Sequence, residues 1–278
     1  MPLPTPYYDR DGITIYNADN VALMKEMEPA SIDLVVTSPP YDELKTYSAG
    51  KPMSELWDFE GVAQQLWRVI KPGGVVVWVV ADATVNGSET GTSFRQALRF
   101  MEIGFRLHDT MIWQRTSLPL THNRYEQDFE FMFILSRGSP TFNGLRIPCV
   151  HAGKQPVGGT RQGGDDIRQR HTICQVRESR LRGNVWAINT GYMKCTKDAV
   201  AHQHPAIFPE ALVRDHILTW SNEGDVVLDP FSGSGTTAKM AREMGRRAVG
   251  IEINKDYCDI AVERLRQKLL PLGGEQCA

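Results

Sequence analysis

Strand and helix patterns alternate along most of this 278-residue chain, and the alternation limits the folds that it can adopt. Residues 32–37 and 75–80 are short valine-rich runs, the pattern of buried strands. Between them, residues 56–70 carry apolar side chains at helical spacing and end at a Pro-Gly-Gly turn. Because strands that alternate with helices pair in parallel, we expect an α/β fold with a mainly parallel sheet and helices on both faces. Further strands are predicted over 13–16, 105–114, 129–136, 226–228 and 248–253, and further helices over 21–27, 94–101, 208–220, 236–244 and 257–270.

The alternation fails from about residue 137 to residue 197, where glycine, arginine and polar residues dominate. It resumes with the helix predicted over 208–220, and the apolar stretch at 185–188 is a candidate for the strand that returns the chain from the insert to the fold. The simplest organisation is therefore one α/β domain in two pieces, 1–136 and 185–278, interrupted by an irregular insert over 137–184. A chain of this length buries a sizeable core without metal or disulfide support.

Composition and targeting features indicate a cytoplasmic protein. The five cysteines are widely spaced and form no C-x-x-C pair, so we expect neither a disulfide framework nor a metal site. The longest uncharged apolar run, 75–81, is far too short to span a bilayer, and the first residues lack the basic start and apolar stretch of a secretory signal. We therefore expect no membrane partner.

The net charge of −2 is the sum of two oppositely charged parts. Residues 137–197 contain eleven arginines and lysines and three acids, a net charge of +8, which leaves −10 for the rest of the chain. An excess of positive charge in a glycine-rich segment fits contact with the phosphate backbone of DNA, and arginine also pairs with guanine edges in the major groove. The candidate DNA-binding residues of the insert are Arg161, Arg168, Arg170, His171, Arg177, Arg180 and Arg182.

A glycine-rich turn, Asp-Pro-Phe-Ser-Gly-Ser-Gly at 229–235, follows a short strand and opens a helix. Glycine lets the backbone approach a ligand closely, and a helix N-terminus favours an anionic group. Glu252 stands 23 residues after Asp229, at the end of the next strand, where an acid accepts both hydroxyl hydrogens of a ribose. Ala238 replaces the last glycine of the usual dinucleotide pattern, so the turn predicts a nucleoside-containing cofactor and not specifically NAD.

A second constellation, Thr-Ser-Pro-Pro-Tyr at 37–41, stands at the end of strand 32–37. Its two prolines fix the backbone and remove two N–H donors, which leaves carbonyl oxygens beside the hydroxyl of Ser38 and the ring of Tyr41. Acceptors next to a stacking face suit a planar ring that bears an exocyclic amino group. The structural alternative is a Pro-Pro pair that ends a strand beside a packed tyrosine.

Together the two constellations resemble the motifs of the amino-DNA methyltransferases, which methylate exocyclic amines of adenine or cytosine. Residues 229–235 match D-P-F-x-G-x-G for S-adenosylmethionine, and residues 38–41 match [DNS]-P-P-[YFW] for the target base. The target-base motif comes first, as in the permuted β class of that family. The resemblance implies a circularly permuted Rossmann-like methyltransferase sheet with a target-recognition insert. It also implies that the chain is cut inside one βαβ unit, so that its two ends lie close together.

The resemblance further implies the roles of individual residues. Ser38, Pro39, Pro40 and Tyr41 form the catalytic motif: the base is flipped out of the duplex, Tyr41 stacks on it, and Ser38 Oγ and the Pro39 carbonyl accept the two amino hydrogens. In the cofactor site, Asp19 is expected to contact the adenine and Glu252 the ribose. The candidate cofactor-binding residues are Asp19, Asn20, His204, Pro205, Phe208, Asp229, Phe231, Ser232, Gly233, Ser234, Gly235, Thr236, Thr237, Glu252 and Ile253.

The motifs leave open which base is methylated. Serine at position 38 favours N4 of cytosine, whereas the many adenine enzymes of the β class favour N6 of adenine, to which we lean slightly. Alternative functions are methyl transfer to RNA or to a protein amide, and DNA binding by a regulator with an inactive methyltransferase fold. The expected partners are double-stranded DNA and a second copy of the chain in a homodimer. No nuclease motif is visible, so either a solitary enzyme or half of a restriction-modification pair fits. Tryptophans in apolar patterns, expected in the core, are Trp57, Trp78, Trp113, Trp186 and Trp220.

Overall fold

The computed structural model describes residues 3–40, 57–115, 125–149, 177–191 and 193–266. They fall into two compact units, one within Met1–Asn143 and Asn184–Ala278 and the other within Gly144–Gly183.

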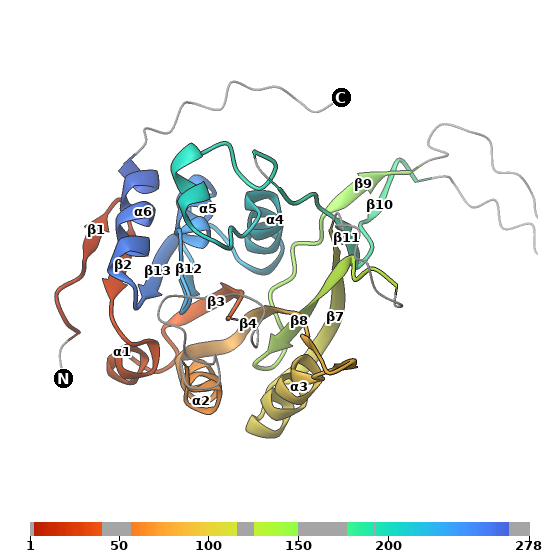
Figure 1. The fold of residues 1–278 in the computed structure, drawn as a ribbon, viewed down its shortest axis with the longest axis horizontal. Coiled ribbons are helices and arrows are strands. Elements are labelled where there is room, and N and C mark those ends of the chain that lie inside the picture. The colour runs from red at the N-terminus through yellow and green to blue at the C-terminus, as the bar shows by residue number, and fades with distance from the viewer. Residues whose placement is uncertain (1–2, 41–56, 116–124, 150–176, 192, 267–278) are drawn as a thin grey trace, which may run out of the picture. The chain divides into compact units, whose positions relative to one another are not determined.

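The larger unit is built on one nine-stranded sheet, in which all neighbouring strands are parallel except β1–β2, β4–β8 and β8–β7. The expected mainly parallel α/β sheet is therefore confirmed (Figure 1). The long apolar runs are buried on both faces, as the pattern predicts for central strands: every residue from Val75 to Val80 is buried. In spatial order the strands are β1 (Tyr8–Arg10), β2 (Ile13–Asn17), β13 (Arg247–Glu252), β12 (Val226–Asp229), β3 (Ile32–Thr37), β4 (Ile70–Val80), β8 (Phe129–Ser136), β7 (Arg106–Gln114) and β11 (Val185–Ala187).

Helices cover both faces of this sheet, also as expected (Figure 1). On one face lie α1 (Asn20–Glu26), α2 (Phe59–Val69) and α3 (Thr92–Ile103), and on the other lie α4 (Glu210–Trp220), α5 (Thr236–Glu243) and α6 (Lys255–Arg266). The first group packs its apolar stripes on the sheet around Trp78, which is fully buried.

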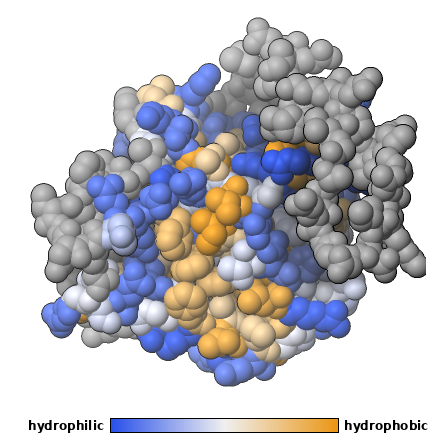
Figure 2. All heavy atoms as spheres, turned by 90° about the vertical axis from the view of Figure 1, so that its right-hand side faces the viewer, coloured by the Kyte–Doolittle hydropathy of each residue, from blue (hydrophilic) through white to orange (hydrophobic). Residues whose placement is uncertain are grey.

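Helix α3 carries apolar side chains outward as well as inward. Ala97 and Phe100 are buried, whereas Phe94, Leu98 and Met101 are 45–59% exposed. Figure 2, which faces the side of the fold where α3 lies, shows apolar side chains gathered on this surface. Three of the exposed large apolar side chains of the described residues therefore lie on this one helix.

The circular permutation is visible in the strand pairing. β2, from the start of the chain, pairs in parallel with β13, from its end, with Ile13 opposite Ala248 and Asn17 opposite Glu252. Helix α6 follows β13 and packs against β2, so a crossover helix and its two strands come from opposite ends of the sequence. The first residues also contact α6, because the Tyr7 hydroxyl donates a hydrogen bond to Asp259.

Several boundaries differ from the prediction by one to three residues, and the start of β4 differs by five, for a physical reason. Strand β4 begins at Ile70 and runs through the Pro-Gly-Gly sequence that was expected to be a turn. The pairing of β3 with β4 contains an irregularity between Ile32 and Leu34, which accommodates the glycines. A Cβ at Gly74 would lie 2.9 Å from the carbonyl oxygen of Asp33, so glycine permits this close approach of two strands.

Several short elements were not predicted because each offers too few residues for a periodic pattern. They are β1, the hairpin of β5 (Thr84–Val85) and β6 (Ser88–Glu89), and the 3-10 helix η2 (Ala199–Gln203). In the smaller unit, β9 (Arg146–Pro148) pairs antiparallel with β10 (Ser179–Leu181). Within the described parts of the chain, no helix is both long and apolar enough to cross a membrane.

Candidate functional site

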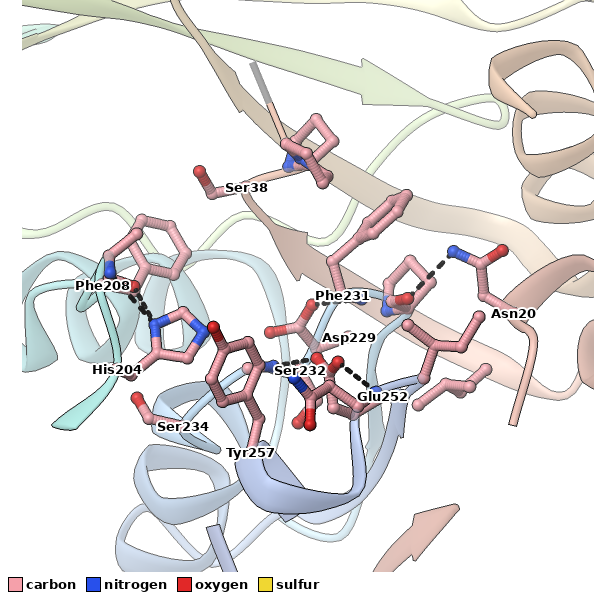
Figure 3. A pocket seen from close by; sticks show the side chains of 18 of the residues that line it. Asn20, Ser38, His204, Phe208, Asp229, Phe231, Ser232, Ser234, Glu252 and Tyr257 are labelled. Atoms are coloured by element: carbon pink, nitrogen blue, oxygen red, sulfur yellow. Dashed lines mark hydrogen bonds between the residues drawn. The ribbon is translucent and has the colours of Figure 1, made fainter. Parts of the chain in front are cut away.

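The carboxyl ends of β2, β13, β12 and β3 meet at one edge of the sheet, the edge where open α/β sheets bind ligands. A cavity of about 280 Å³ lies there. Figure 3 shows Ser38 on the opposite side of this cavity from Glu252 and Tyr257. Of the predicted site residues, those that line it are Asp19, Asn20, Ser38, Pro39, Pro40, His204, Phe208, Asp229, Phe231, Ser232, Gly233, Ser234, Thr236, Glu252 and Ile253.

The glycine-rich turn forms the floor of the cavity, and two of its residues must be glycine. Gly233 and Gly235 have φ values of +48° and +74°, and α5 begins directly afterwards. A Cβ at Gly233 would lie 3.0 Å from His204 Nε2, and one at Gly235 would lie 2.7 Å from the Cβ of Ala261. Gly235 therefore allows the turn to pack on α6 and does not itself line the cavity.

The carboxylate of Glu252 joins this turn to the end of β13. Its Oε2 accepts a hydrogen bond from the backbone N–H of Gly233 at 2.8 Å, and its Oε1 accepts one from Asn254 at 2.8 Å. Burial raises the pKa of the Glu252 carboxyl above its ordinary value. Each oxygen of a carboxylate accepts more than one hydrogen bond, so the group also has capacity for ligand hydroxyls.

Asp229 links the two sequence motifs directly. The hydroxyl of Thr37, which precedes Ser38, donates to Asp229 Oδ1 at 2.6 Å, and the N–H of Phe231 donates to the same oxygen at 3.1 Å. Asp229 is buried, and burial raises the pKa of its carboxyl. The end of β3 and the glycine-rich turn are therefore held together by one buried acid.

The catalytic motif reaches the cavity through its first three residues. Ser38, Pro39 and Pro40 follow the last residue of β3 and line the wall. Tyr41 lies outside the described residues, as do the candidate DNA-binding residues Arg161, Arg168, Arg170 and His171. Arg177, Arg180 and Arg182 belong to the described part of the smaller unit; Arg177 and Arg180 are exposed, and Arg182 is half-buried.

Asp19 and Asn20 follow β2 and bring the start of the chain to the cavity. Asp19 caps α1, because its Oδ1 accepts a hydrogen bond from the N–H of Ala22 at 2.8 Å. Asn20 Nδ2 donates to the carbonyl oxygen of Pro230 at 3.1 Å and so ties this segment to the glycine-rich turn (Figure 3).

The ring of His204 lies against the glycine-rich turn at Gly233. Its Nδ1 lies 2.8 Å from the carbonyl oxygen of Ala206 and accepts from the N–H of Ala206 at 3.1 Å. Its ring meets Tyr257 edge to face, with the centroids 4.2 Å apart. Pro205 and Thr237 do not line the cavity; the Thr237 hydroxyl donates to the carbonyl oxygen of Val36 at 3.2 Å, beneath the turn.

Further residues line the cavity that were not predicted to do so, among them Trp57, Trp113, Glu130 and Tyr257. Trp57 and Trp113 were expected in the core, and they both pack and line the wall. Trp57 meets Phe231 edge to face at 5.1 Å, and Trp113 Nε1 donates to the carbonyl oxygen of Ile188 at 2.9 Å. One feature of the sequence sets Glu130 apart as a candidate site residue: it is the single acid in the apolar strand β8.

The cavity has the donor and acceptor set of a nucleoside-type ligand. Ser232 Oγ is buried and has no hydrogen-bond partner among the described residues, although Ser232 lines the cavity. A buried hydroxyl in that position calls for a polar ligand group. Together with Glu252 and the glycine-rich turn, it fits a cofactor that carries both a ribose and an amino-acid end. Among the described residues, no group of three His, Cys, Asp or Glu side chains is placed to hold a metal ion.

Comparisons with known proteins agree with this geometry. A family model described as DNA methylase, of the N6/N4 type, matches residues 32–263. The chain is 52% identical over 254 residues to the orphan methyltransferase M.BamHII of Bacillus amyloliquefaciens, covering 89% of this chain and 94% of that one. It is 29% identical to the type II methyltransferase M.BglII of Bacillus subtilis, over 95% of this chain and 71% of the relative.

Two solved structures share the fold. The PvuII DNA methyltransferase, named as cytosine-N4-specific, matches with a TM-score of 0.69 and 20% identity over 95% of this chain and 90% of that one. TTHA0409 of Thermus thermophilus, complexed with S-adenosyl-L-methionine, matches with a TM-score of 0.59 and 25% identity over 90% of this chain and 93% of that one. The family model, the relatives and the shared fold therefore show that this chain belongs to the N6/N4 DNA methylase family and is a DNA methyltransferase that uses S-adenosyl-L-methionine.

Proposed function

We propose that this enzyme methylates N4 of cytosine at a specific sequence in duplex DNA. The observation that carries the choice of base is Ser38, which lines the cavity with a neutral hydroxyl where many adenine enzymes of the resembled class have Asp or Asn. This reverses the slight preference for adenine N6. The PvuII enzyme, whose fold this chain shares, is named as cytosine-N4-specific, and this name supports the same choice.

The catalytic problem is that the lone pair of a base amine is delocalised into the ring. Ser38 Oγ and the Pro39 carbonyl accept the two amino hydrogens, which localises the lone pair on nitrogen and makes it a nucleophile. The target base is flipped out of the duplex to reach them. S-adenosyl-L-methionine supplies, when bound, a methyl group on a positively charged sulfur. Catalysis then depends on positioning and on acceptors that are oriented in advance, with no covalent enzyme intermediate.

The cofactor is held by the residues around the glycine-rich turn. Glu252 accepts hydrogen bonds from the ribose hydroxyls, and Asp19 contacts the adenine. Ser232 Oγ, which lacks a partner among the described residues, bonds to the methionine end. Phe231 and Ile253, which both line the cavity, form the apolar surface beside the adenine.

The remaining assignments concern the insert and the assembly. The insert 137–184 recognises the target sequence, and its basic residues contact phosphates and guanine edges. The halves 1–136 and 185–278 supply the catalytic and cofactor-binding parts. The enzyme works as a homodimer in the cytoplasm, a compartment that suits cysteines outside disulfides, such as Cys149 and Cys258. Sedimentation of the purified protein tests the dimer.

Nucleoside mass spectrometry of methylated DNA tests the proposal. Duplex DNA incubated with the protein and S-adenosyl-L-methionine is expected to yield N4-methylcytosine, and a Ser38→Ala variant provides the background. N6-methyladenine as the product would contradict the choice of base. Methyl transfer to RNA or to protein glutamine, with none to duplex DNA, would contradict the choice of substrate.

A further inference from the structure

A buried cation lies directly beneath the glycine-rich turn. Arg264 of α6 is fully buried, and its Nη1 donates to the carbonyl oxygen of Ser234 at 2.8 Å. The same nitrogen lies 3.1 Å from Ser234 Oγ and 2.9 Å from Thr236 Oγ1. One guanidinium, which does not line the cavity, therefore holds the backbone and hydroxyl of Ser234 in the turn and the hydroxyl of Thr236 at the start of α5.

Two acids balance the charge of Arg264. Its Nε lies 3.1 Å from Asp198 Oδ2, and its Nη2 lies 2.8 Å from Glu210 Oε1. Lys239 of α5 binds the same two oxygens, at 2.8 Å and 2.7 Å. Burial raises the pKa of Asp198, but its bonds to Lys239 and Arg264 together hold that pKa below its ordinary value, so Asp198 stays ionised. These two cations and two acids thus form one network, to which Glu243 also belongs, with its Oε1 3.8 Å from Lys239 Nζ.

The two acids bracket the segment that covers the turn. Asp198 directly precedes η2, and Glu210 is the first residue of α4. His204 lies between them. A Cβ added to Gly233 would lie 3.0 Å from Nε2 of the His204 ring, so this ring lies close to the turn. Phe208 of the same segment lines the cavity. Arg264 therefore binds both ends of the segment 198–210 as well as the turn beneath it.

We propose that Arg264 is a positioning residue for the cofactor, which fixes the segment 198–210 over the glycine-rich turn without touching the cofactor itself. This rests on the proposed assignment of the cavity as the cofactor site. Arg264 does not line the cavity, and its side-chain hydrogen bonds within the described residues go to the turn, to Thr236 at the start of α5, or to an acid at an end of the segment. Without these bonds, the turn and its cover move independently, and cofactor binding must then order both.

Arginine is required because its planar fork reaches several acceptors in fixed directions, whereas lysine is a point charge. Arg264→Lys keeps the positive charge of the network but cannot hold Ser234, Asp198 and Glu210 together. The dissociation constant of S-adenosyl-L-methionine, measured by calorimetry without DNA, is expected to rise about tenfold or more. The kcat at saturating cofactor is expected to stay near the wild-type value, while KM for the cofactor rises.

Arg68→Lys is the matched control. Arg68 of α2 also binds buried backbone, donating to the carbonyl oxygens of Met24 and Met27, but on the other face of the sheet. Its replacement is expected to lower the melting temperature without changing cofactor affinity. Asp198→Asn provides a second test of the network if Arg264→Lys does not fold. In the double variant, which combines Arg264→Lys and Asp198→Asn, the fold increase in the dissociation constant is expected to be smaller than the product of the two single-variant increases.

The outcomes separate this proposal from the assignment of the site. If Arg264→Lys and Asp198→Asn lower the melting temperature while cofactor affinity stays at the wild-type value, Arg264 is only structural and the proposal is wrong. If Glu252→Ala also binds the cofactor as tightly as the wild type, the cavity is not the cofactor site.

Discussion

Ser38 is the residue whose hydroxyl is expected to act on the target base. It follows β3 directly and lines the cavity with Pro39 and Pro40. Ser38→Ala removes one acceptor for the amino hydrogens, so we expect kcat to fall about 100-fold, as when one preoriented hydrogen-bonding group of an active site is removed. The dissociation constant of S-adenosyl-L-methionine is expected to be unchanged. Single-turnover methylation and calorimetry measure the two quantities.

The control for this substitution is Ser88→Ala in the exposed β5–β6 hairpin, which is expected to leave both quantities unchanged. A wild-type kcat in the Ser38→Ala enzyme would show that Ser38 Oγ is not a required hydrogen-bond acceptor in the mechanism.

Glu252 is expected to make cofactor binding depend on pH. Burial raises the pKa of its carboxyl above the ordinary value of 4.5, so the protonated form persists to higher pH than in water. A protonated carboxyl is a weaker acceptor for ribose hydroxyls, and cofactor affinity is therefore expected to fall as the pH decreases toward 4.5, beginning above that value.

Glu252→Gln isolates this effect, because it keeps the size of the side chain but replaces one acceptor oxygen with a donor. The variant is expected to bind the cofactor more weakly than the wild type at neutral pH. The ratio of the two dissociation constants should approach one as the pH is lowered. A ratio that does not change with pH would show that Glu252 does not titrate in the binding step.

At the scale of elements, β3 and β12 are joined by pairing and also by the bond from Thr37 to Asp229 at 2.6 Å. Thr37→Val keeps the shape of the side chain but leaves a buried carboxylate without this donor. We expect the free energy of unfolding to fall by about 1–3 kcal/mol, the cost of removing the partner of a buried acceptor. Urea unfolding measures it, and kcat is expected to fall as well because Ser38 follows Thr37.

Thr14→Val is the matched control for Thr37→Val. The hydroxyl of Thr14 donates to Asp9 at 3.2 Å in an exposed pair, so its removal is expected to change stability by less than about 0.5 kcal/mol. Equal destabilisation in the two variants would mean that the buried bond to Asp229 contributes no more to stability than the exposed bond to Asp9.

At the scale of the whole molecule, charge is divided between an acidic body and a basic insert. Replacing Arg177, Arg180 and Arg182 together with glutamine is expected to weaken DNA binding and to flatten its salt dependence. The slope of log K against log salt concentration should decrease by about 0.9 for each phosphate that the variant no longer neutralises. Fluorescence anisotropy with a duplex at several salt concentrations measures the slope.

A triple variant of exposed residues in the larger unit, Arg10, Lys25 and Arg106 to glutamine, changes the net charge by the same amount. If this control flattened the salt dependence equally, overall charge and not the insert would explain binding.

Most strands and helices were predictable because each is a local apolar pattern of sufficient length. The bounds of β3 and β8 match the predicted 32–37 and 129–136. The start of β4 at Ile70 was not predictable, since the irregular pairing with β3 depends on a neighbouring strand. For a similar reason Trp57 and Trp113 were expected only in the core: an apolar pattern predicts burial but does not show that the same ring lines a cavity.

The sequence by itself determined the family, the cofactor and the alternation of strands and helices, because motif spacing and hydrophobic periodicity are local properties of the chain. Only the tertiary structure decided which distant groups meet. Thr37 bonds to Asp229, 192 residues away, and β2 pairs with β13 across almost the whole chain. Arg264, which no motif singled out, lies buried beneath the glycine-rich turn. The physical reason is that burial and hydrogen-bond geometry depend on segments brought together by the packing of the sheet, and such contacts leave no periodic trace in the sequence.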